Sequence, residues 1–305
     1  MSSGGADYDV LVFGSCIVDF ISYVPRLPKV GETLHGTQFA TGNGGKGANQ
    51  CVAATRLGSR TAIIGKLGDD PWGTAYYTAL AAEGVNVEHV DRVPDESTGI
   101  AQINVANNGD NQIVIVTGAN KRLGPSDVVR RQDLFDRAHV LVCQLETPVE
   151  GTIAALHAFK GVSILNAAPA ESNLPHSLLS LATIFCAKAA THKLQDMGCK
   201  TVIVTLGEKG AVFAQPDNDN RVYHVKPMKV NKVVDTTGAG DAFIGALAHY
   251  LAKHPDAELG NCIAAANRVA AWSVQKPGTQ SSFPRAGDLE LPADLATLQN
   301  QWECV

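Results

Sequence analysis

The 305-residue sequence has few charged residues (18%) and few aromatic ones (6%), whereas 45% of its residues are hydrophobic. This composition is typical of a soluble globular protein with a substantial core, and the length fits one large α/β domain or two modest ones. A basic stripe is lacking and the formal net charge is −5, which argues against nucleic acid as a partner. No apolar run is long enough to span a membrane, and the Ala-rich stretch 239–252 is too short and has polar flanks.

Cysteine pairs of the C-x-x-C type are also lacking. The seven cysteines are odd in number and scattered along the chain, which is the pattern of reduced core thiols rather than of a disulfide framework or a zinc site. The first residues, MSSGGADYD, have neither the basic region nor the apolar run of a signal peptide. We therefore expect a cytoplasmic protein, with the nucleus as an alternative.

Apolar β-type runs alternate with helical patterns through most of the sequence. Runs such as LVFG, VLVC and VIVT are continuous, which is typical of strands covered on both faces. The alternation predicts an α/β fold with a doubly wound, mostly parallel sheet. We expect it to form one domain over residues 1–305. The predicted strands are 10–13, 62–64, 140–143, 163–166, 183–186 and 202–205, and the predicted helices are 49–57, 72–83, 126–136, 151–159 and 242–252.

One region departs from this rhythm. Residues 99–105 and 112–116 are alternating strands on either side of Asn107-Asn108-Gly109-Asp110, which predicts a hairpin. Residues 32–39 offer a third short strand. We interpret segments 32–39 and 99–116 as a small β-sheet lid that also serves as a dimer surface, with an ordinary edge hairpin as the alternative.

Two glycine clusters stand where helices are predicted to begin. Thr41 to Gln50 reads TGNGGKGANQ, in which Lys46 and Asn49 can donate to hydroxyls or phosphates, although the order is not that of a P-loop. Val234 to Phe243 reads VDTTGAGDAF and follows the β-prone residues 232–234. Backbone N–H groups at such a junction can bind an anion, with Asp241 beside them. A flexible turn and an ordinary helix start are the alternatives for the two clusters.

A third candidate is Asp19, which we place in a loop after the first strand. The carboxyl ends of parallel strands face the ligand crevice, where an acid can accept hydrogen bonds from a polyol. A solvated loop acid or a helix cap would explain the residue equally well. The three features together on an α/β pattern favour a binding site.

These segments resemble the two signature motifs of the ribokinase family of carbohydrate kinases, in Gly44–Gln50 and Asp235–Asp241. The similarity extends from about Tyr8 to Pro284. It includes Gly14-Ser15 with Asp19, Gln144-Leu145-Glu146, Asn166, Thr205-Leu206-Gly207 with Gly210, and the stretch GTQSS at 278–282.

The resemblance implies an ATP-dependent kinase that phosphorylates the 5-hydroxyl of D-ribose. Asp241 matches the catalytic base, and Gly238, Ala239 and Gly240 match the anion hole for the γ-phosphoryl group. Mg²⁺ would arrive with ATP, and K⁺ would be the monovalent activator. The sugar-binding positions would be Asp19, Gly45, Lys46, Asn49, Glu146 and Asp241. The ATP-binding positions would be Thr205, Gly207, Gly210 and Asn267 together with the anion hole. The monovalent cation would be bound near Asp235, Thr237, Ser273, Lys276, Gly278 and Ser282.

The sequence departs from the family pattern after Cys186. Family members continue there into an Asn-x-x-Glu motif that positions Mg²⁺ and phosphate, whereas this chain runs directly into Ala187-Lys188. Because a misplacement of about 1 Å can cost about 10²-fold in rate, we expect lower activity than in a relative with that segment. Two further hypotheses remain open: a kinase for another sugar or a nucleoside, and a non-catalytic relative that binds sugar or nucleotide.

Overall fold

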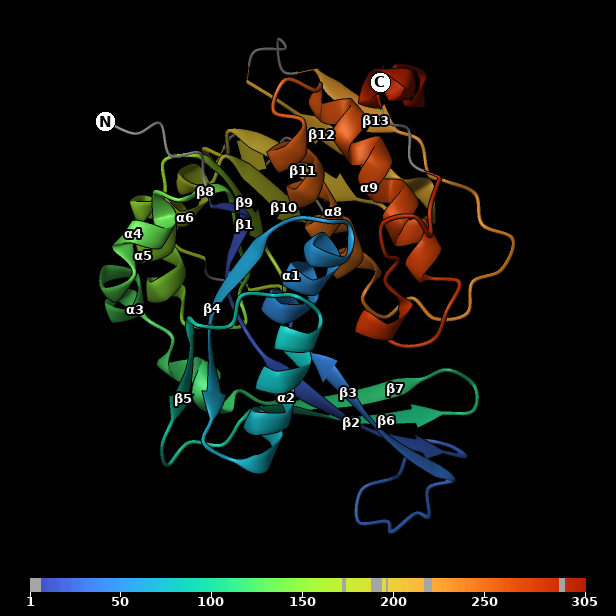
Figure 1. Ribbon diagram of the computed structural model, residues 1–305. Helices are drawn as coiled ribbons and strands as arrows, with labels where there is room; N and C mark the ends of the chain where they lie inside the picture. The colour runs from blue at the N-terminus through green and yellow to red at the C-terminus, as the bar shows by residue number, and fades with distance from the viewer. Residues whose placement is uncertain (1–6, 172–173, 188–193, 196, 217–220, 291–293) are drawn as a thin grey trace.

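A ten-stranded sheet forms the body of the molecule (Figure 1). The computed structural model describes residues 7–171, 174–187, 194–195, 197–216, 221–290 and 294–305. The strands of the sheet are β1 (Tyr8–Phe13), β4 (Thr61–Gly68), β5 (Val90–Val93), β8 (Ala138–Cys143), β9 (Val162–Asn166), β10 (Ile184–Ala187), β11 (Thr201–Thr205), β12 (Ala211–Ala214), β13 (Val222–Val225) and β14 (Trp302–Cys304).

The order of these strands confirms the predicted doubly wound topology. Across the sheet they run β14-β13-β12-β11-β10-β9-β8-β1-β4-β5. Neighbours from β11 to β5 are parallel, whereas β12, β13 and β14 add an antiparallel edge. Because the order reverses direction between β1 and its neighbours β4 and β8, the carboxyl end of β1 lies at a topological switch point, where ligands bind in open α/β sheets.

Helices cover both faces of the sheet (Figure 1). Val10 and Val12 of β1 pack with the helices of one face, and Leu11 and Phe13 pack with those of the other, which explains why the apolar run of this strand is continuous. The first face carries α1 (Lys46–Arg56), α2 (Pro71–Ala82), α8 (Ala239–Lys253) and α9 (Leu259–Ser273). The second carries α3 (Pro125–Arg130), α4 (Gln132–Phe135), α5 (Val149–Ala158) and α6 (His176–Leu181). The 3₁₀ helices are η1 (Gly118–Arg122), η2 (Gly207–Lys209), η3 (Gln280–Ser282) and η4 (Leu295–Gln301).

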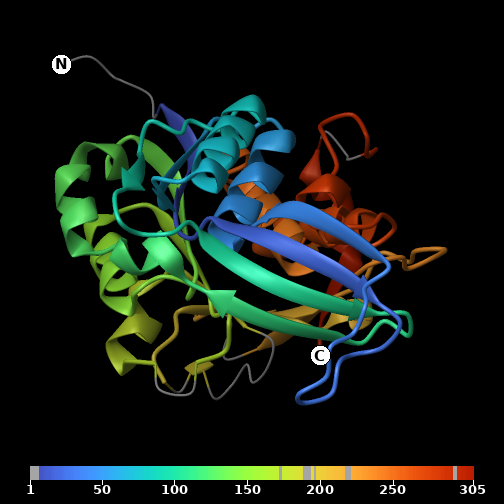
Figure 2. The ribbon, with the colours of Figure 1, turned by 90° about the horizontal axis from the view of Figure 1, so that it is seen from below.

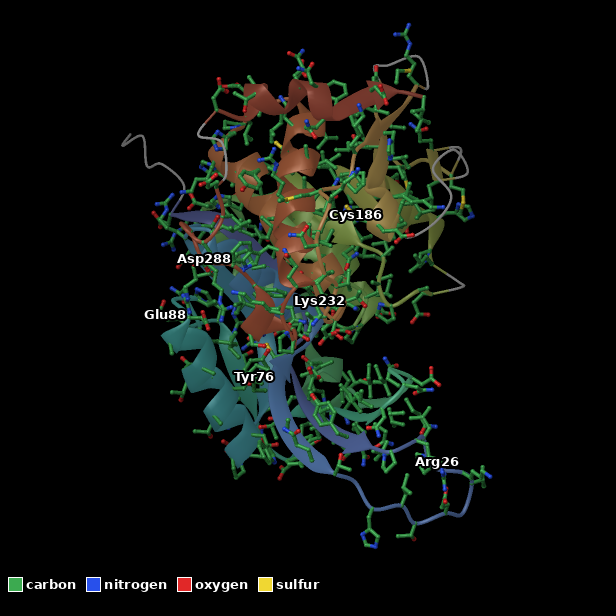
Figure 3. The ribbon with its side chains drawn as sticks, turned by 90° about the vertical axis from the view of Figure 1, so that its right-hand side faces the viewer. Arg26, Tyr76, Glu88, Cys186, Lys232 and Asp288 are labelled. Carbon is green, nitrogen blue, oxygen red and sulfur yellow. The ribbon has the colours of Figure 1, made fainter. Side chains whose placement is uncertain are left out.

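A second, four-stranded sheet stands off the body and forms the lid (Figure 2). Its order is β3-β2-β6-β7, in which β2 pairs antiparallel with β3 and parallel with β6, and β6 and β7 form the predicted hairpin. Arg26 lies at the outer end of this sheet, far from Cys186 in the body (Figure 3). The lid strands are β2 (Ile17–Val24), β3 (Gln38–Gly44), β6 (Gly99–Ala106) and β7 (Asn111–Val116).

Four local predictions were wrong. Asp19 lies on strand β2 and not in a loop, because Gly14, Ser15 and Cys16 turn the chain directly from β1 into the lid. The third lid strand begins at Gln38, so residues 32–37 are irregular and the first part of the glycine cluster belongs to β3. Segment 126–136 forms two helices that meet at Arg131. Residues 232–234 are extended but unpaired with any described strand.

The cysteines are mostly buried and unpaired, as the sequence analysis predicted for reduced core thiols. All seven cysteines are free, six of them are buried, and only Cys304 is exposed. Burial raises the pKa of Cys51 to about 12, which leaves this thiol protonated and unreactive. In the described part of the chain, no helix combines the length and apolarity that a membrane crossing requires.

Candidate active site

Two glycine turns begin the helices that build the site. Gly45 precedes α1 with φ 85°, and Gly238 precedes α8 with φ 77°. A Cβ atom on Gly45 would lie 2.7 Å from the backbone nitrogen of Ile17, and one on Gly238 would lie 2.6 Å from Cγ2 of Thr279. Both turns therefore require glycine, for their backbone conformation and for close approach. Helices α1 and α8 pack against each other and so bring the two predicted motifs together (Figure 1).

Asp241 lies in the first turn of α8 and is 8% exposed. Its Oδ2 accepts a hydrogen bond from Nδ2 of Asn49 at 2.9 Å, and its Oδ1 accepts one from Nε2 of Gln50 at 2.8 Å. The first N–H groups of a helix have no acceptor within the helix and can bind an anion beside this carboxylate. Here the N–H of Ala239 donates weakly, at 3.3 Å, to the carbonyl of Thr236, which precedes the helix. A Cβ atom on Gly240 would meet no atom within 4 Å, which shows open space at this helix end.

Glu146 is held at the start of α1. Its Oε2 accepts hydrogen bonds from the hydroxyl of Ser15 at 2.6 Å and from the backbone N–H of Lys46 at 2.8 Å. The ammonium of Lys46 lies 4.0 Å from the other carboxylate oxygen. The predicted pair Lys46 and Glu146 is thereby brought together, although the two residues are separated by 100 positions in the sequence.

Asp19 completes a group of three acids. Burial, together with the negative charges of Glu146 and Asp241, raises the pKa of Asp19 to about 7. A Cβ atom on Gly44 would lie only 2.5 Å from a carboxylate oxygen of Asp19, so glycine at this position of β3 leaves room for the acid. Acids, amides and an ammonium gathered in this way are suited to a ligand with many hydroxyl groups.

The sequence analysis named three amide residues, Gln50, Gln144 and Asn166, but did not predict that their side chains meet behind Asp241. Gln50 donates to Asp241 and also to Oδ1 of Asn166, at 3.1 Å, while its own Oε1 accepts a hydrogen bond from Nε2 of Gln144 at 2.8 Å. These residues come from α1, β9 and the turn after β8. Gln50 belongs to the glycine motif and Gln144 and Asn166 follow strands, but only the packing of α1 over the sheet shows that they meet.

The residues predicted for the nucleotide lie around one loop. Thr205 ends β11, and Gly207 and Gly210 have φ values of 61° and 85° in the turn to β12. A Cβ atom on Gly210 would lie 2.2 Å from the carbonyl oxygen of Val225. Nδ2 of Asn267, on α9, donates to the carbonyl of Lys226, the residue after Val225, at 3.3 Å. The structure thus brings Gly210 and Asn267 to the same segment.

The residues predicted for a monovalent cation lie on two touching loops. The carboxylate of Asp235 accepts hydrogen bonds from the backbone N–H groups of Thr237 and Gly278, both at 2.9 Å. Burial alone would raise the pKa of Asp235, but these hydrogen bonds outweigh it and lower the pKa. The backbone N–H groups of Val234 and Asp235 also donate to the carbonyl of Val274.

At the other positions predicted for the cation, the side chains of Ser273, Ser282 and Lys276 have other partners, so any oxygen ligands there would come from the backbone. The hydroxyls of Ser273 and Ser282 donate to carbonyls of their own turns, at 2.8 Å and 2.7 Å. The ammonium of Lys276 lies 4.9 Å from the centre of the Trp272 ring and not at Asp235.

The predicted gap after Cys186 falls at the centre of the sheet. Cys186 lies in β10, which pairs in parallel with both β9 and β11. The sequence that follows the strand, 188–193, lies outside the described residues. Strand β10 is therefore present, and the departure from the family pattern concerns what comes after it.

The fold and the site together define a class of protein. A buried carboxylate at a helix N-terminus, with open space beside Gly240 and further acids and amides near it, is suited to phosphoryl transfer. The profile of the pfkB family carbohydrate kinases matches residues 7–187 and 179–286. The two matched stretches overlap over residues 179–187, which include β10, just before the point where the sequence departs from the family pattern.

Curated relatives agree with this match. The chain is 42% identical to mouse ribokinase over 307 positions, which take in 92% of this chain and 94% of that protein. It is 39% identical to a deoxyribokinase of Salmonella typhi, over 90% of this chain and 95% of that protein. Because the mouse alignment is longer than the aligned part of this chain, the mouse protein contains residues that have no counterpart here.

Solved structures share the fold. Arabidopsis thaliana ribokinase, complexed with ribose and ATP, superposes with a TM-score of 0.85 at 28% identity, covering 97% of this chain and 99% of that one. Ribokinase from Thermotoga maritima superposes with a TM-score of 0.84 at 27% identity, covering 95% and 99%. The chain belongs to the pfkB family of carbohydrate kinases, which confirms the resemblance seen in its sequence.

Proposed function

We propose that this chain transfers the γ-phosphoryl group of ATP to the 5-hydroxyl of D-ribose, giving D-ribose 5-phosphate and ADP. The observation that carries the proposal is Asp241, buried at the start of α8 with one amide hydrogen bond on each carboxylate oxygen. The identity to ribokinases and the likeness to a ribokinase complexed with ribose and ATP support the choice of substrates.

In this mechanism Asp241 accepts the proton of the sugar's 5-hydroxyl. The hydroxyl oxygen forms a bond to the γ-phosphorus while the bond to the bridging oxygen breaks and ADP leaves. The backbone N–H groups of Gly238, Ala239 and Gly240 stabilise the negative charge on the transferred group. In other enzymes the loss of one such donor costs about 10²–10³-fold in rate.

The remaining residues bind the reactants. Asp19 and Glu146 accept hydrogen bonds from sugar hydroxyls, and Lys46, Asn49 and the backbone at Gly45 donate to them. Thr205, Gly207, Gly210 and Asn267 form the nucleotide side. Because the sugar side is built on α1 and the lid strands, and the nucleotide side on β11, η2 and α9, the two substrates meet at the start of α8.

Two metal ions belong to this proposal. The Mg²⁺ ion would be carried by the phosphates of ATP and would keep several of its waters. Asp235, Thr237, Ser273, Lys276, Gly278 and Ser282 would hold K⁺ through oxygen atoms. That ion would neutralise charge and stiffen the loop before Gly238.

We expect turnover to be lower than in a relative that has the Asn-x-x-Glu segment. The split of the family match at β10 supports the absence of residues there. Since the base and the anion-binding turn are intact, we expect the loss to affect the positioning of phosphate rather than to abolish catalysis.

The lid is also proposed to join two copies of the chain. Ile113, Val114, Ile115 and Val116 of its edge strand β7 are each about half exposed, and Phe39 on β3 is 60% exposed. An apolar edge strand of this kind favours association. Light scattering that shows a monomer at micromolar concentration would contradict this part of the proposal.

Two other functions are supported by particular observations. The deoxyribokinase relative favours 2-deoxy-D-ribose as an alternative acceptor. The departure after Cys186 favours a protein that binds sugar or nucleotide without turnover. A nucleoside is the weaker choice, because Asp19, Lys46 and Asn49 offer polar groups rather than an apolar wall for a base.

The test is ADP release by the purified protein with Mg²⁺-ATP and K⁺, with and without each sugar. We expect release to depend on D-ribose and to fall at least 10³-fold in Asp241→Asn, which keeps the shape of the side chain but removes the base. Asp256→Asn, on an exposed turn, is the matched control and should be fully active. Ribose binding without ADP release in the folded protein would support the non-catalytic alternative instead.

A further inference from the structure

We propose that Gln280 is a positioning residue for the reaction, because its carboxamide fixes the orientation of the Asn49 amide and thereby the direction in which Asp241 is held. This inference rests on the proposed function of Asp241. Gln280 opens η3, in the loop that also carries Gly278 and Ser282, and its carboxamide donates to Asn49, one of the proposed sugar-binding residues.

The contacts of Gln280 are buried and short. Its Nε2 donates to Oδ1 of Asn49 at 3.0 Å and to the phenol oxygen of Tyr76 at 3.1 Å. Gln280, Asn49 and Tyr76 are only 8%, 5% and 1% exposed. Tyr76 lies where the lid joins the body (Figure 3). At such burial an unpaired amide or phenol would lose its hydrogen bond without gaining one to water.

In this chain of hydrogen bonds, each group can act as donor or acceptor in only one way. The backbone carbonyl of Gly44 is an acceptor, so the hydroxyl of Tyr76 donates its single proton to it and must accept from Gln280. Gln280 therefore presents its NH₂ group to Tyr76 and to Asn49. Asn49 in turn presents its carbonyl to Gln280 and its NH₂ group to the Asp241 carboxylate.

Without this constraint the Asn49 amide has two orientations of similar shape. The flipped orientation would place its carbonyl oxygen against a carboxylate oxygen of Asp241, where neither atom has a proton. The flip would also place the Asn49 NH₂ group against the NH₂ group of Gln280, so the donor from Gln280 adds a second penalty to the wrong orientation and holds the Asn49 donor on Asp241.

The backbone of Gln280 is itself anchored to the helix that carries Asn49. The guanidinium of Arg56, on α1, donates to the backbone carbonyls of Gln280 and Phe283. Arg56 also forms an ion pair with Glu83 at 2.6 Å, and both side chains are mostly buried. Helix α1, which carries Asn49, therefore also anchors the backbone of Gln280 through Arg56.

The first test is Gln280→Met, which keeps the length of the side chain and removes its donors. We expect kcat to fall about tenfold or more, with KM for ATP within twofold of the wild type, because the Gln280 carboxamide donates to Asn49 and Tyr76, on the proposed sugar side. Gln275→Met, in the exposed turn after α9, is the matched control and should leave kcat unchanged. A kcat for Gln280→Met within twofold of the wild type would overturn the inference.

A double variant separates positioning from general destabilisation. If Gln280 acts through Asn49, then Gln280→Met added to Asn49→Leu should cause no further loss of kcat beyond twofold. If the two losses multiply, Gln280 acts elsewhere in the structure and the inference is wrong.

A third readout does not require activity. In ¹⁵N-labelled protein, the Nδ2 protons of Asn49 should exchange with water at least tenfold faster in Gln280→Met than in the wild type. Unchanged exchange would overturn the inference. Failure of the proposed function would look different, since an inactive wild-type protein would still show faster exchange in Gln280→Met.

Discussion

Adding a single methyl group at Gly245 should separate Asp241, the proposed catalytic base, from the amides that hydrogen-bond to it. Gly245 lies one helical turn after Asp241 on the same face of α8. A Cβ atom there would lie 2.4 Å from the backbone carbonyl oxygen of Gln50 and 2.6 Å from Cβ of Ala53, whereas ordinary contact begins near 3.4 Å. Gly245→Ala therefore requires α1 and α8 to move apart by about 1 Å.

The size of the effect follows from that displacement. Hydrogen bonds of 2.8 Å and 2.9 Å from Gln50 and Asn49 to Asp241 would lengthen beyond the usual limit of about 3.2 Å. A displacement of about 1 Å costs about 10²-fold in rate, so we expect kcat to fall by that factor. Overpacking costs about 1–3 kcal/mol of unfolding free energy, offset by about 1 kcal/mol of helix propensity, so the variant should still fold.

The assay is kcat for ADP release at saturating ATP and ribose, with the unfolding midpoint measured in parallel. Gly124→Ala is the matched control, because a Cβ atom there would meet no atom within 4 Å and its φ of −145° suits alanine. If Gly245→Ala retains kcat within threefold of the wild type, then close packing of α1 on α8 does not position Asp241, and the reasoning is wrong.

Two further predictions concern the acids around the site. Because the pKa of Asp19 is raised to about 7, this carboxyl group is mostly protonated below pH 7. If ribose binds only to the carboxylate form, its Kd, measured by calorimetry, should rise about tenfold from pH 8 to pH 6, and a pH-independent Kd would contradict this. Asp235→Ala removes the acceptor of two backbone N–H groups, so the free energy of unfolding, measured with denaturant, should fall by about 1–3 kcal/mol. We also expect kcat to fall at least tenfold, and an unchanged kcat would show that the loops around Asp235 and Gly278 do not support the turn before α8.

Six strands of the main sheet, β1, β4, β8, β9, β10 and β11, could be predicted because they are largely buried and therefore apolar. Strands β5, β12, β13 and β14 were not predicted, because they have only three or four residues each and most of them are partly exposed. Strand β2 was missed because the chain turns from β1 into the lid within three residues, with no proline or long loop to mark a new element. Residues 232–234 have the composition of a strand, but Val233 and Val234 are about half exposed and find no strand partner. Partner availability is a tertiary property that local composition does not encode.

Part of the site could be predicted because some of its residues stand together in short sequence motifs. Asp241, Asn49 and Lys46 stand in glycine-rich motifs whose chemistry is local. Gln50 and Gln280 make their decisive hydrogen bonds to residues 191 and 231 positions away, so no spacing in the sequence relates them.

The central claim is that this chain phosphorylates the primary hydroxyl of ribose, with Asp241 as base. The most direct measurement is ³¹P NMR of the purified protein with Mg²⁺-ATP, K⁺ and D-ribose. The account predicts ADP and an equal amount of a phosphomonoester whose phosphorus couples to the two protons of C5, and neither product with Asp241→Asn. ADP with inorganic phosphate alone, or no change in the ATP signals of a folded protein that binds ribose, would contradict it.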